Sequence, residues 1–106
     1  MFARSVSIRL KNKSVAEFTR LIENHAIPLL RRQQGFQDEL AFVLPGGSEA
    51  VVISLWDEKR NADSYGRNAF PEVVKALSKV LVGTPEVRTY EVSHSTFHKI
   101  AALAGV

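Results

Sequence analysis

A short apolar run at residues 50–58 (AVVISLWDE) limits the folds open to this chain more than any other stretch. Its first seven residues are apolar or small, are rich in β-branched side chains and end on the only tryptophan, Trp56, before the acid pair Asp57 and Glu58. Two glycines precede the stretch, which is typical of a buried β-strand. Alternation along the strand places Val51, Ile53 and Leu55 on one face, and Ala50, Val52, Ser54 and Trp56 on the other. Both faces must therefore be covered, by other parts of the chain or by a partner.

The size and composition point to one domain, residues 1–106, in which 97–106 form a small, mostly apolar C-terminal tail. The net charge of +3 is scattered rather than gathered with aromatic residues, so nucleic-acid binding is not expected. No apolar run approaches the roughly 20 residues of a membrane-spanning helix, and the first residues do not resemble a signal peptide. The absence of cysteine favours a cytoplasmic location.

Alternating apolar and polar residues predict three further strands, at 2–11, 36–44 and 86–97. In the first of them Arg4 is an exception, because it falls on the otherwise apolar face. Residues 45–48 (PGGS) are typical of a hairpin turn. The strand before this turn is therefore expected to pair antiparallel with the run that ends at Trp56.

The first helix is expected to begin with a capping box, in which Ser14 is the N-cap and Glu17 reaches back to it. Apolar residues then recur at helical spacing until Gly35, which is predicted to end the helix. Pro28 lies inside this pattern and predicts a kink or break near residues 25–27.

Two shorter helices are expected after Trp56. Asp57 is a candidate N-cap for a helix through about Tyr65, which Gly66 interrupts. Pro71 suits the first turn of a third helix, and Gly83 is predicted to end it.

The resulting order, β-α-β-β-α-β, predicts an α+β protein of the ferredoxin-like class, with a four-stranded antiparallel sheet and helices on one face. The helices leave the second face of the sheet uncovered, although its strands are apolar there. An exposed apolar sheet face marks an interface. We therefore expect a homodimer in which the two sheets face each other.

Trp56 is the first candidate for function, because it ends the central strand where small Ser54 leaves room beside it. The pattern predicts a ligand pocket formed by Trp56, Ser54, Tyr65 and Phe70, in which the tryptophan stacks on a flat ligand. The alternative is that Trp56 is an ordinary core aromatic. His25 and Tyr65 are the base-like groups expected near the pocket, and they are the candidate catalytic residues.

No metal site is expected. His94 and His98 lie four residues apart, a spacing of roughly 13 Å in an extended strand, which is too far to share one ion. In a helix the same spacing would suit a metal, but Ser95 and Thr96 argue against a helix there. His25 belongs to a different element, and no cysteine or carboxylate cluster accompanies the histidines.

Four stretches resemble the antibiotic biosynthesis monooxygenase (ABM) domain: residues 28–36 (PLLRRQQGF), 54–57 (SLWD), 70–77 (FPEVVKAL) and 84–92 (TPEVRTYEV). The resemblance covers nearly the whole chain, so we treat 1–106 as one ABM-like domain. It implies a dimeric α+β barrel with a pocket between sheet and helices. Some members of that family oxidise aromatic polyketides or quinols with oxygen and no cofactor, and others degrade haem.

The resemblance to the haem degraders is incomplete. Where they carry an asparagine, this chain has Val6, or Ser5 or Ser7 if the register shifts. Where they carry an iron-ligating histidine it has Val74, and only the tryptophan position, Trp56, is kept. Haem degradation is therefore not expected. The resemblance implies a cofactor-independent monooxygenase acting on a small flat aromatic or quinol-type compound. The alternative is a non-catalytic dimeric domain that binds a small ligand or serves as an accessory module.

Overall fold

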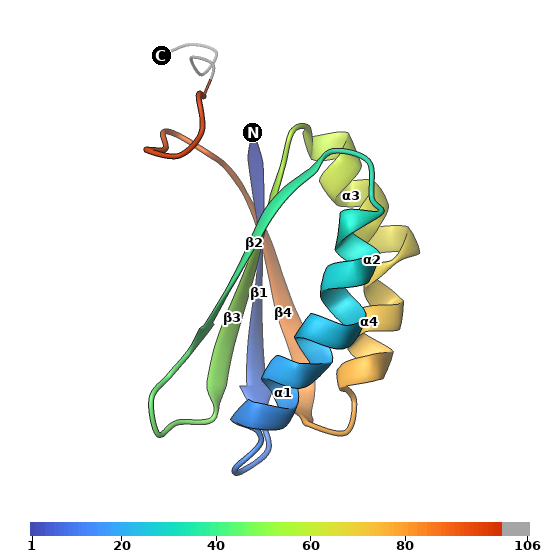
Figure 1. The fold of residues 1–106 in the computed structure, drawn as a ribbon, viewed down its shortest axis with the longest axis vertical. Coiled ribbons are helices and arrows are strands. Elements are labelled where there is room, and N and C mark those ends of the chain that lie inside the picture. The colour runs from blue at the N-terminus through green and yellow to red at the C-terminus, as the bar shows by residue number, and fades with distance from the viewer. Residues whose placement is uncertain (101–106) are drawn as a thin grey trace.

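The computed structural model describes residues 1–100. In this part of the chain, four strands form one antiparallel sheet in the order β2-β3-β1-β4. The strands are β1 (Phe2–Leu10), β2 (Phe36–Val43), β3 (Glu49–Trp56) and β4 (Leu81–Glu91). The helical elements are α1 (Val15–Leu21), the π-helical turn η1 (Ile22–Ala26), α2 (Ile27–Arg31), α3 (Lys59–Asn68) and α4 (Phe70–Leu77). All helices lie against one face of the sheet (Figure 1), which confirms the predicted ferredoxin-like α+β fold.

The face of the sheet that the helices cover, called here the inner face, carries the core. Alternate residues of β1 are buried on it: Arg4, Val6, Ile8 and Leu10. Val6 and Ile8 lie opposite Val52 and Ala50 of β3 in the antiparallel register. Phe18, Ile22, Val73 and Leu77 close the core from the helical side. Each such large side chain contributes about 1.5–3 kcal/mol through its burial, so the core fixes the helices to this face.

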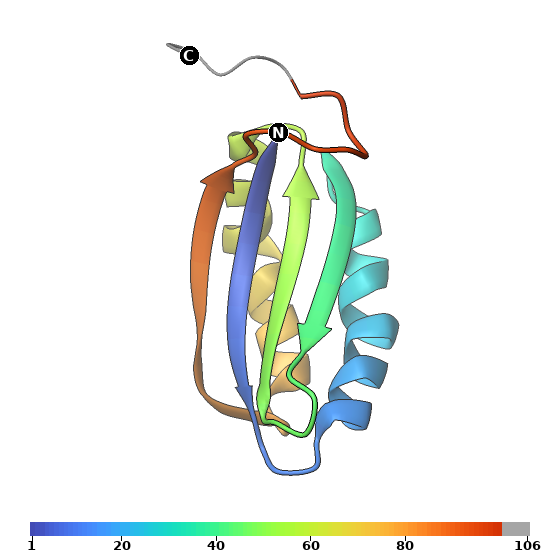
Figure 2. The same cartoon turned by 90° about the vertical axis from the view of Figure 1, so that its left-hand side faces the viewer.

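The opposite face of the sheet, called here the outer face, is free of helices (Figure 2). Its apolar residues are concentrated on β2 and β3, where Leu40 and Phe42 are each 53% exposed and pair with Ile53 and Val51. The β1 and β4 half is more polar, with residues such as Ser5 opposite Arg88. The uncovered apolar surface is therefore densest on the β2 and β3 half, although Tyr90 and Val82 of β4 are also exposed on this face.

The first helical region differs from the prediction at both ends. Ser14 is the N-cap residue of α1, as predicted, but its hydroxyl donates to the Asn12 carbonyl oxygen and Glu17 pairs with Arg20 and Lys79, so the reciprocal hydrogen bonds of the predicted capping box do not form. The helix ends at Arg31, before Gly35.

Pro28 does not break the helix. The kink expected near residues 25–27 takes the form of η1, in which the Ile27 N–H donates to the carbonyl oxygen of Ile22, five residues back. A proline has no N–H to donate and its ring crowds the preceding turn. A wider π turn before Pro28 accommodates both effects without ending the helix.

The second helical region also differs from the prediction. Glu58, not Asp57, is the N-cap residue of α3; the Asp57 carboxylate instead accepts hydrogen bonds from the adjacent Glu58 N–H and the Asn61 side chain. The helix runs through Gly66 to Asn68 without interruption. Gly66 faces the sheet, where a Cβ atom would lie 3.2 Å from Nη2 of Arg4. Gly66 therefore leaves room for the Arg4 side chain and does not end the helix.

The last strand begins earlier and ends earlier than predicted. Helix α4 ends at Leu77, well before Gly83, and β4 spans Leu81–Glu91 rather than 86–97. Gly83, with φ of 72°, and Pro85 lie in an irregularity of β4 where the pairing with β1 shifts between Ser7 and Arg9. Strand β4 is at an edge of the sheet, where an irregularity containing proline is tolerated.

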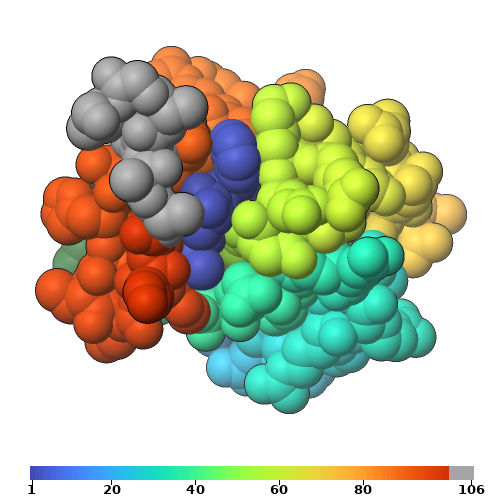
Figure 3. Space-filling model, turned by 90° about the horizontal axis from the view of Figure 1, so that it is seen from above, coloured from blue at the N-terminus to red at the C-terminus, as the bar shows by residue number. Residues whose placement is uncertain are grey.

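After β4 the chain crosses the end of the sheet near the N-terminus and reaches β2 (Figure 3). There His98 Nε2 lies 2.5 Å from Asp38 Oδ2. The rest of the predicted tail, 101–106, lies outside the described residues. Within residues 1–100, the helices are too short or too polar to cross a membrane.

Candidate functional site

The residues predicted to form a pocket lie together near the end of β3. Trp56 is completely buried, and its Nε1–H donates to the Ser54 hydroxyl at 2.8 Å. Its ring centroid lies 5.1 Å from that of Tyr65 and 5.7 Å from that of Phe36. Tyr65 in turn lies 6.1 Å from Phe70. These separations are those of interacting aromatic rings, so the four side chains form one aromatic cluster.

Strand β2 contributes to the cluster through an irregularity in its pairing. Phe36 lies opposite Trp56, but Asp38 lies opposite Leu55, so one extra residue of β2 is accommodated between them. In a regular strand, residues three apart point to opposite faces. The irregularity instead brings Phe36 and Glu39 to the same, inner face, an arrangement that bulges near binding sites often produce.

A row of polar residues crosses the inner face beside the aromatic cluster. The row contains one residue from each strand, at matching positions of the strand register. In the order of the strands across the sheet these residues are Glu39 (β2), Ser54 (β3), Arg4 (β1) and Thr89 (β4). Ser54 and Arg4 are the two buried polar residues of this part of the chain. A polar row within an otherwise apolar inner face is the clearest chemical feature of the structure.

Arg4 is the charged residue of this row and is only 6% exposed. Its guanidinium carbon lies 4.1 Å from the centroid of the Phe70 ring and 5.3 Å from that of Tyr65. No carboxylate among residues 1–100 forms an ion pair with it. Burial lowers the pKa of Arg4, while Tyr65 and Asp63 act in the opposite direction. An arginine side chain nevertheless stays protonated in proteins, so a buried cation faces the aromatic cluster.

Two acidic groups of the inner face, Tyr65 and Glu39, have altered ionisation. Burial raises the pKa of Tyr65 to about 12; the charge of Arg4 opposes this shift, and that of Glu39 adds to it. Burial also raises the pKa of the half-buried Glu39. At neutral pH, Tyr65 is therefore a hydrogen-bond donor and not a base, whereas Glu39 is a stronger base than an exposed glutamate.

A small cavity of about 20 Å³ lies between the inner face and the helices. Its polar and aromatic lining comprises Arg4, Ser54, Tyr65 and Phe70, and its apolar lining includes Ile22 and Ala26 of η1 and Val73 of α4. The volume is about that needed for one water molecule. Trp56 and Glu39 lie outside the lining, Trp56 behind its partners Ser54 and Tyr65. The structure thus brings three of the four predicted pocket residues to the cavity wall and leaves Trp56 in the layer behind them.

His25 lies away from this cavity. It is exposed and lines a separate groove of about 260 Å³ on the outside of the helical layer, between η1 and α2 on one side and α4 on the other. Val73 lines both the groove and the cavity. His25 is therefore separated from the cavity, and Val73 is the residue that the two linings share.

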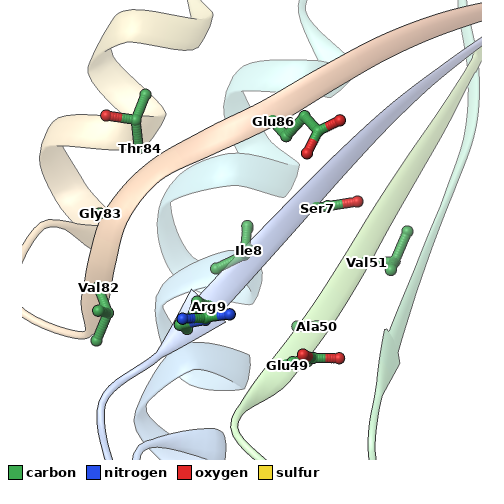
Figure 4. A pocket seen from close by; sticks show the side chains of 10 residues that line it. All are labelled: Ser7, Ile8, Arg9, Glu49, Ala50, Val51, Val82, Gly83, Thr84 and Glu86. Carbon is green, nitrogen blue, oxygen red and sulfur yellow. The ribbon is translucent and has the colours of Figure 1, made fainter.

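A larger hollow, of about 460 Å³, lies on the outer face where β4 departs from β1 (Figure 4). Residues of β1, β3 and β4 line it, among them Ser7, Arg9, Glu49 and Glu86. The hollow belongs to the open surface of the sheet and contains none of the predicted site residues. Its size follows from the irregular pairing at Gly83 rather than from a built site.

Within residues 1–100, no three side chains of the histidine, cysteine, aspartate or glutamate types are grouped so as to hold a metal ion. Val74, at the position compared with the iron-ligating histidine of the haem degraders, is half-buried on α4. A valine side chain offers no ligand atom to iron.

Sequence reasoning missed Arg4 and Glu39 as candidate site residues. The signal for Arg4 was present, since a charged residue on the apolar face of a strand has to be explained by something buried beside it. Glu39 gave no such signal, because strict alternation places it on the face opposite Phe36. Only the pairing of β2 with β3 shows that both side chains share the inner face.

No protein-family model matches the sequence, and neither does any curated protein. Several solved structures share the fold. One is SnoaB, a cofactor-independent oxygenase from Streptomyces nogalater, with a TM-score of 0.71, 16% identity, and coverage of 90% of this chain and 95% of the other. A protein of unknown function from Nitrosomonas europaea matches with a TM-score of 0.75, 18% identity and coverage of 95% and 94%.

A third structure, of an antibiotic biosynthesis monooxygenase, matches with a TM-score of 0.69, 14% identity, and coverage of 87% of this chain and 98% of the other. These matches span nearly the whole chain and confirm the expected resemblance to the ABM fold. At such low identities the likeness establishes the fold and not an activity.

Proposed function

We propose that this protein, which has the fold of the antibiotic biosynthesis monooxygenases, binds a small flat aromatic or quinol-type compound between its sheet and its helices and oxidises it with oxygen without a cofactor. The observation that carries the proposal is the cavity wall formed by Arg4, Ser54, Tyr65 and Phe70 in an otherwise apolar interior. Apolar cavities with a few convergent polar groups are typical ligand sites.

The chemistry asked of such a site is limited. An electron-rich aromatic compound can pass an electron to oxygen once it is deprotonated, so the protein has to bind, deprotonate and desolvate it. With an anthrone, the substrate's CH₂ group gives up two hydrogen atoms and gains one oxygen atom as a carbonyl, and the second oxygen atom leaves as water. Both electrons needed for that water come from the substrate.

In this proposal Tyr65 is a hydrogen-bond donor, and Glu39, which lies on the inner face outside the lining of the small cavity, becomes the base once the cavity widens along the polar row. The raised pKa of Glu39 favours proton abstraction, whereas a tyrosine with a pKa of about 12 holds its proton at neutral pH. Glu39 and Arg4 lie two strands apart, which corresponds to about 10 Å across the sheet. A single aromatic ring fits across that distance.

A ligand larger than water requires the cavity to widen. The side chain of Val73 separates the cavity from the external groove that His25 lines, and Phe70 is only half-buried. The π turn η1 lies on the same wall, and such turns are frequent at functional sites. We place the ligand entrance here, between η1 and α4.

Oxygen uptake with a panel of hydroquinones and anthrones tests the proposal. We expect turnover by the wild type, and a loss of about a hundredfold in kcat for Glu39→Gln, since general bases contribute at least that much. His25→Gln is the matched control, and it should keep nearly full activity because His25 is exposed on the outside of the helical layer, away from the polar row that contains Glu39. Unchanged uptake by Glu39→Gln would remove Glu39 from the mechanism.

The alternative is a non-catalytic domain that uses the same cavity for a small ligand. The small volume of the cavity and the absence of a histidine from its lining favour this alternative. It predicts that the panel binds without oxygen uptake. Binding can be followed by the fluorescence of Trp56, the only tryptophan, whose ring contacts the cavity residue Tyr65.

The same fold supports a proposal for assembly. Leu40 and Phe42 are exposed on the outer face beside half-buried Val51, Ile53 and Leu55. We propose that a second copy of the chain covers this surface and forms a homodimer through the outer face, because contiguous apolar surface on a sheet marks an interface.

A further inference from the structure

We infer that Arg4 and Ser54 form a recess for an anionic oxygen atom, and that the ligand is therefore a hydroxyaromatic compound bound as its phenolate. This inference rests on the proposed aromatic site and adds the ionisation state of its ligand. It is carried by the geometry of the two buried polar residues in the described part of the chain.

The first observation is a buried positive charge without a matching negative one. Burying a cation is costly unless it is paired, yet no carboxylate among residues 1–100 lies in ion-pair range of Arg4. Neither Asp63 nor Glu39 pairs with Arg4. Asp63 pairs with Lys59 at 2.7 Å, and Glu39 lies two strands away from Arg4. A ligand anion would provide the missing partner.

The second observation is the way in which the Arg4 guanidinium is held. It stacks on Phe70 with 4.1 Å between the guanidinium carbon and the ring centroid, and Gly66 of α3 lies against it without a Cβ atom. Stacking occupies the face of a planar guanidinium and leaves the N–H groups at its edge available. Arg4 also lines the cavity, so these donors border the space for a ligand.

The third observation concerns Ser54, which lies opposite Arg4 in the strand register and lines the same cavity. Its oxygen accepts the hydrogen bond from Trp56 Nε1–H. A hydroxyl group that accepts one hydrogen bond still has its own proton to donate, so Ser54 can also act as a donor. Arg4 and Ser54 thus each present a donor to the same cavity, and fixed donors of this kind stabilise the anionic form of a bound group.

4-Nitrophenol is a suitable probe, because its phenolate absorbs visible light and its ionisation falls in the neutral range. We expect excess wild-type protein to lower the pKa of the bound probe by about one unit, which means an approximately tenfold preference for phenolate over phenol. Arg4→Met should abolish this shift, and Arg4→Lys, which keeps the charge, should retain part of it. The neutral analogue 4-nitroanisole should bind equally to wild type and Arg4→Met.

The outcomes separate the inference from the proposed function. If both probes bind to wild type but the pKa of 4-nitrophenol is unchanged, or if Arg4→Met keeps the shift, the anion recess is wrong and the aromatic site stands. If neither probe binds to the folded wild type, the aromatic site itself is wrong, and the recess with it. A shift present in wild type and lost in Arg4→Met supports both.

Discussion

Tyr65 combines a buried ring with a hydroxyl group whose ionisation is strongly disfavoured. Burial is the main cause of its raised pKa, and the positive charge of Arg4 only partly offsets it. The ring contacts Trp56 on one side and Phe70 on the other, so the tyrosine links the buried tryptophan to the cavity wall. A charged tyrosinate would be poorly solvated in this position.

The titration of Tyr65 is therefore a direct test of the site. The chain has two tyrosines, and in a Tyr90→Phe variant the ultraviolet absorbance of tyrosinate should report Tyr65 alone, with a pKa of about 12. Because this folded-state pKa lies above the unfolded value of 10.0, the stabilisation is fully present below pH 10.0 and is lost as the pH rises through about 12. The loss amounts to about 2–3 kcal/mol.

A tyrosinate signal that appears near pH 10 in folded Tyr90→Phe would contradict the burial of Tyr65. Tyr65→Phe in the wild-type background is the control for stability. It should show no additional loss of stability between pH 10 and 12, because the group that titrates there has been removed.

The connections between elements depend on two glycines that have similar backbone conformations in different surroundings. Gly35, before β2, has φ of 81°, and its carbonyl oxygen accepts the Asp57 N–H at 2.9 Å. A Cβ atom at Gly35 would collide with the side chains of Asp57 and Asn61. Gly46, in the β2–β3 hairpin, has φ of 69° with no atom within 4 Å of a Cβ position.

These two positions predict different costs for the same substitution. Gly46→Ala should lose about 1–2 kcal/mol of unfolding free energy, the strain of a left-handed conformation alone. Gly35→Ala should lose about 1–3 kcal/mol more, because the added methyl group also displaces the side chains of Asp57 and Asn61, which are hydrogen-bonded to each other. Urea unfolding of the two variants measures the difference. Equal losses in the two variants would show that the clash expected at Gly35 adds no cost, and would contradict this prediction.

At the scale of the whole molecule, one layer of helices covers one face of the sheet and leaves the other bare (Figures 1 and 2). A group of apolar residues on the outer face lies on the edge strand β2 and its neighbour β3, and Tyr90 and Val82 are exposed on β4. In water, such a surface is stabilised when another apolar surface covers it. The proposed homodimer provides that cover.

Light scattering tests the assembly directly. The wild type should have about twice the chain mass of 11.8 kDa at micromolar concentration. Phe42→Glu should shift it to the monomer, because a charge buried in the interface would lack a partner. Val87→Glu is the matched control: Val87 is 39% exposed but lies opposite Val6 on the inner face, so the dimer should persist. A monomeric wild type would contradict the proposal.

Much of the fold is determined by the sequence alone, because its signals are local. Alternation along β1 and β3 assigns their faces, the hairpin at 45–48 pairs β2 with β3, and the order of elements leads to the ferredoxin-like class. The burial of Trp56 and its proximity to Ser54 and Tyr65 also follow from short-range patterns and topology. These features depend on residues a few positions apart, whose relative directions the backbone geometry sets.

Tertiary structure alone decided the features that depend on contacts between distant segments. Gly66 continues a helix because Arg4 of β1 occupies the space beside it, and Gly83 with Pro85 belongs to an edge strand instead of a helix end. Glu39 reaches the inner face only because the pairing of β2 with β3 is irregular. A local pattern states what a residue prefers, but its final position depends on which distant side chain fills the neighbouring space.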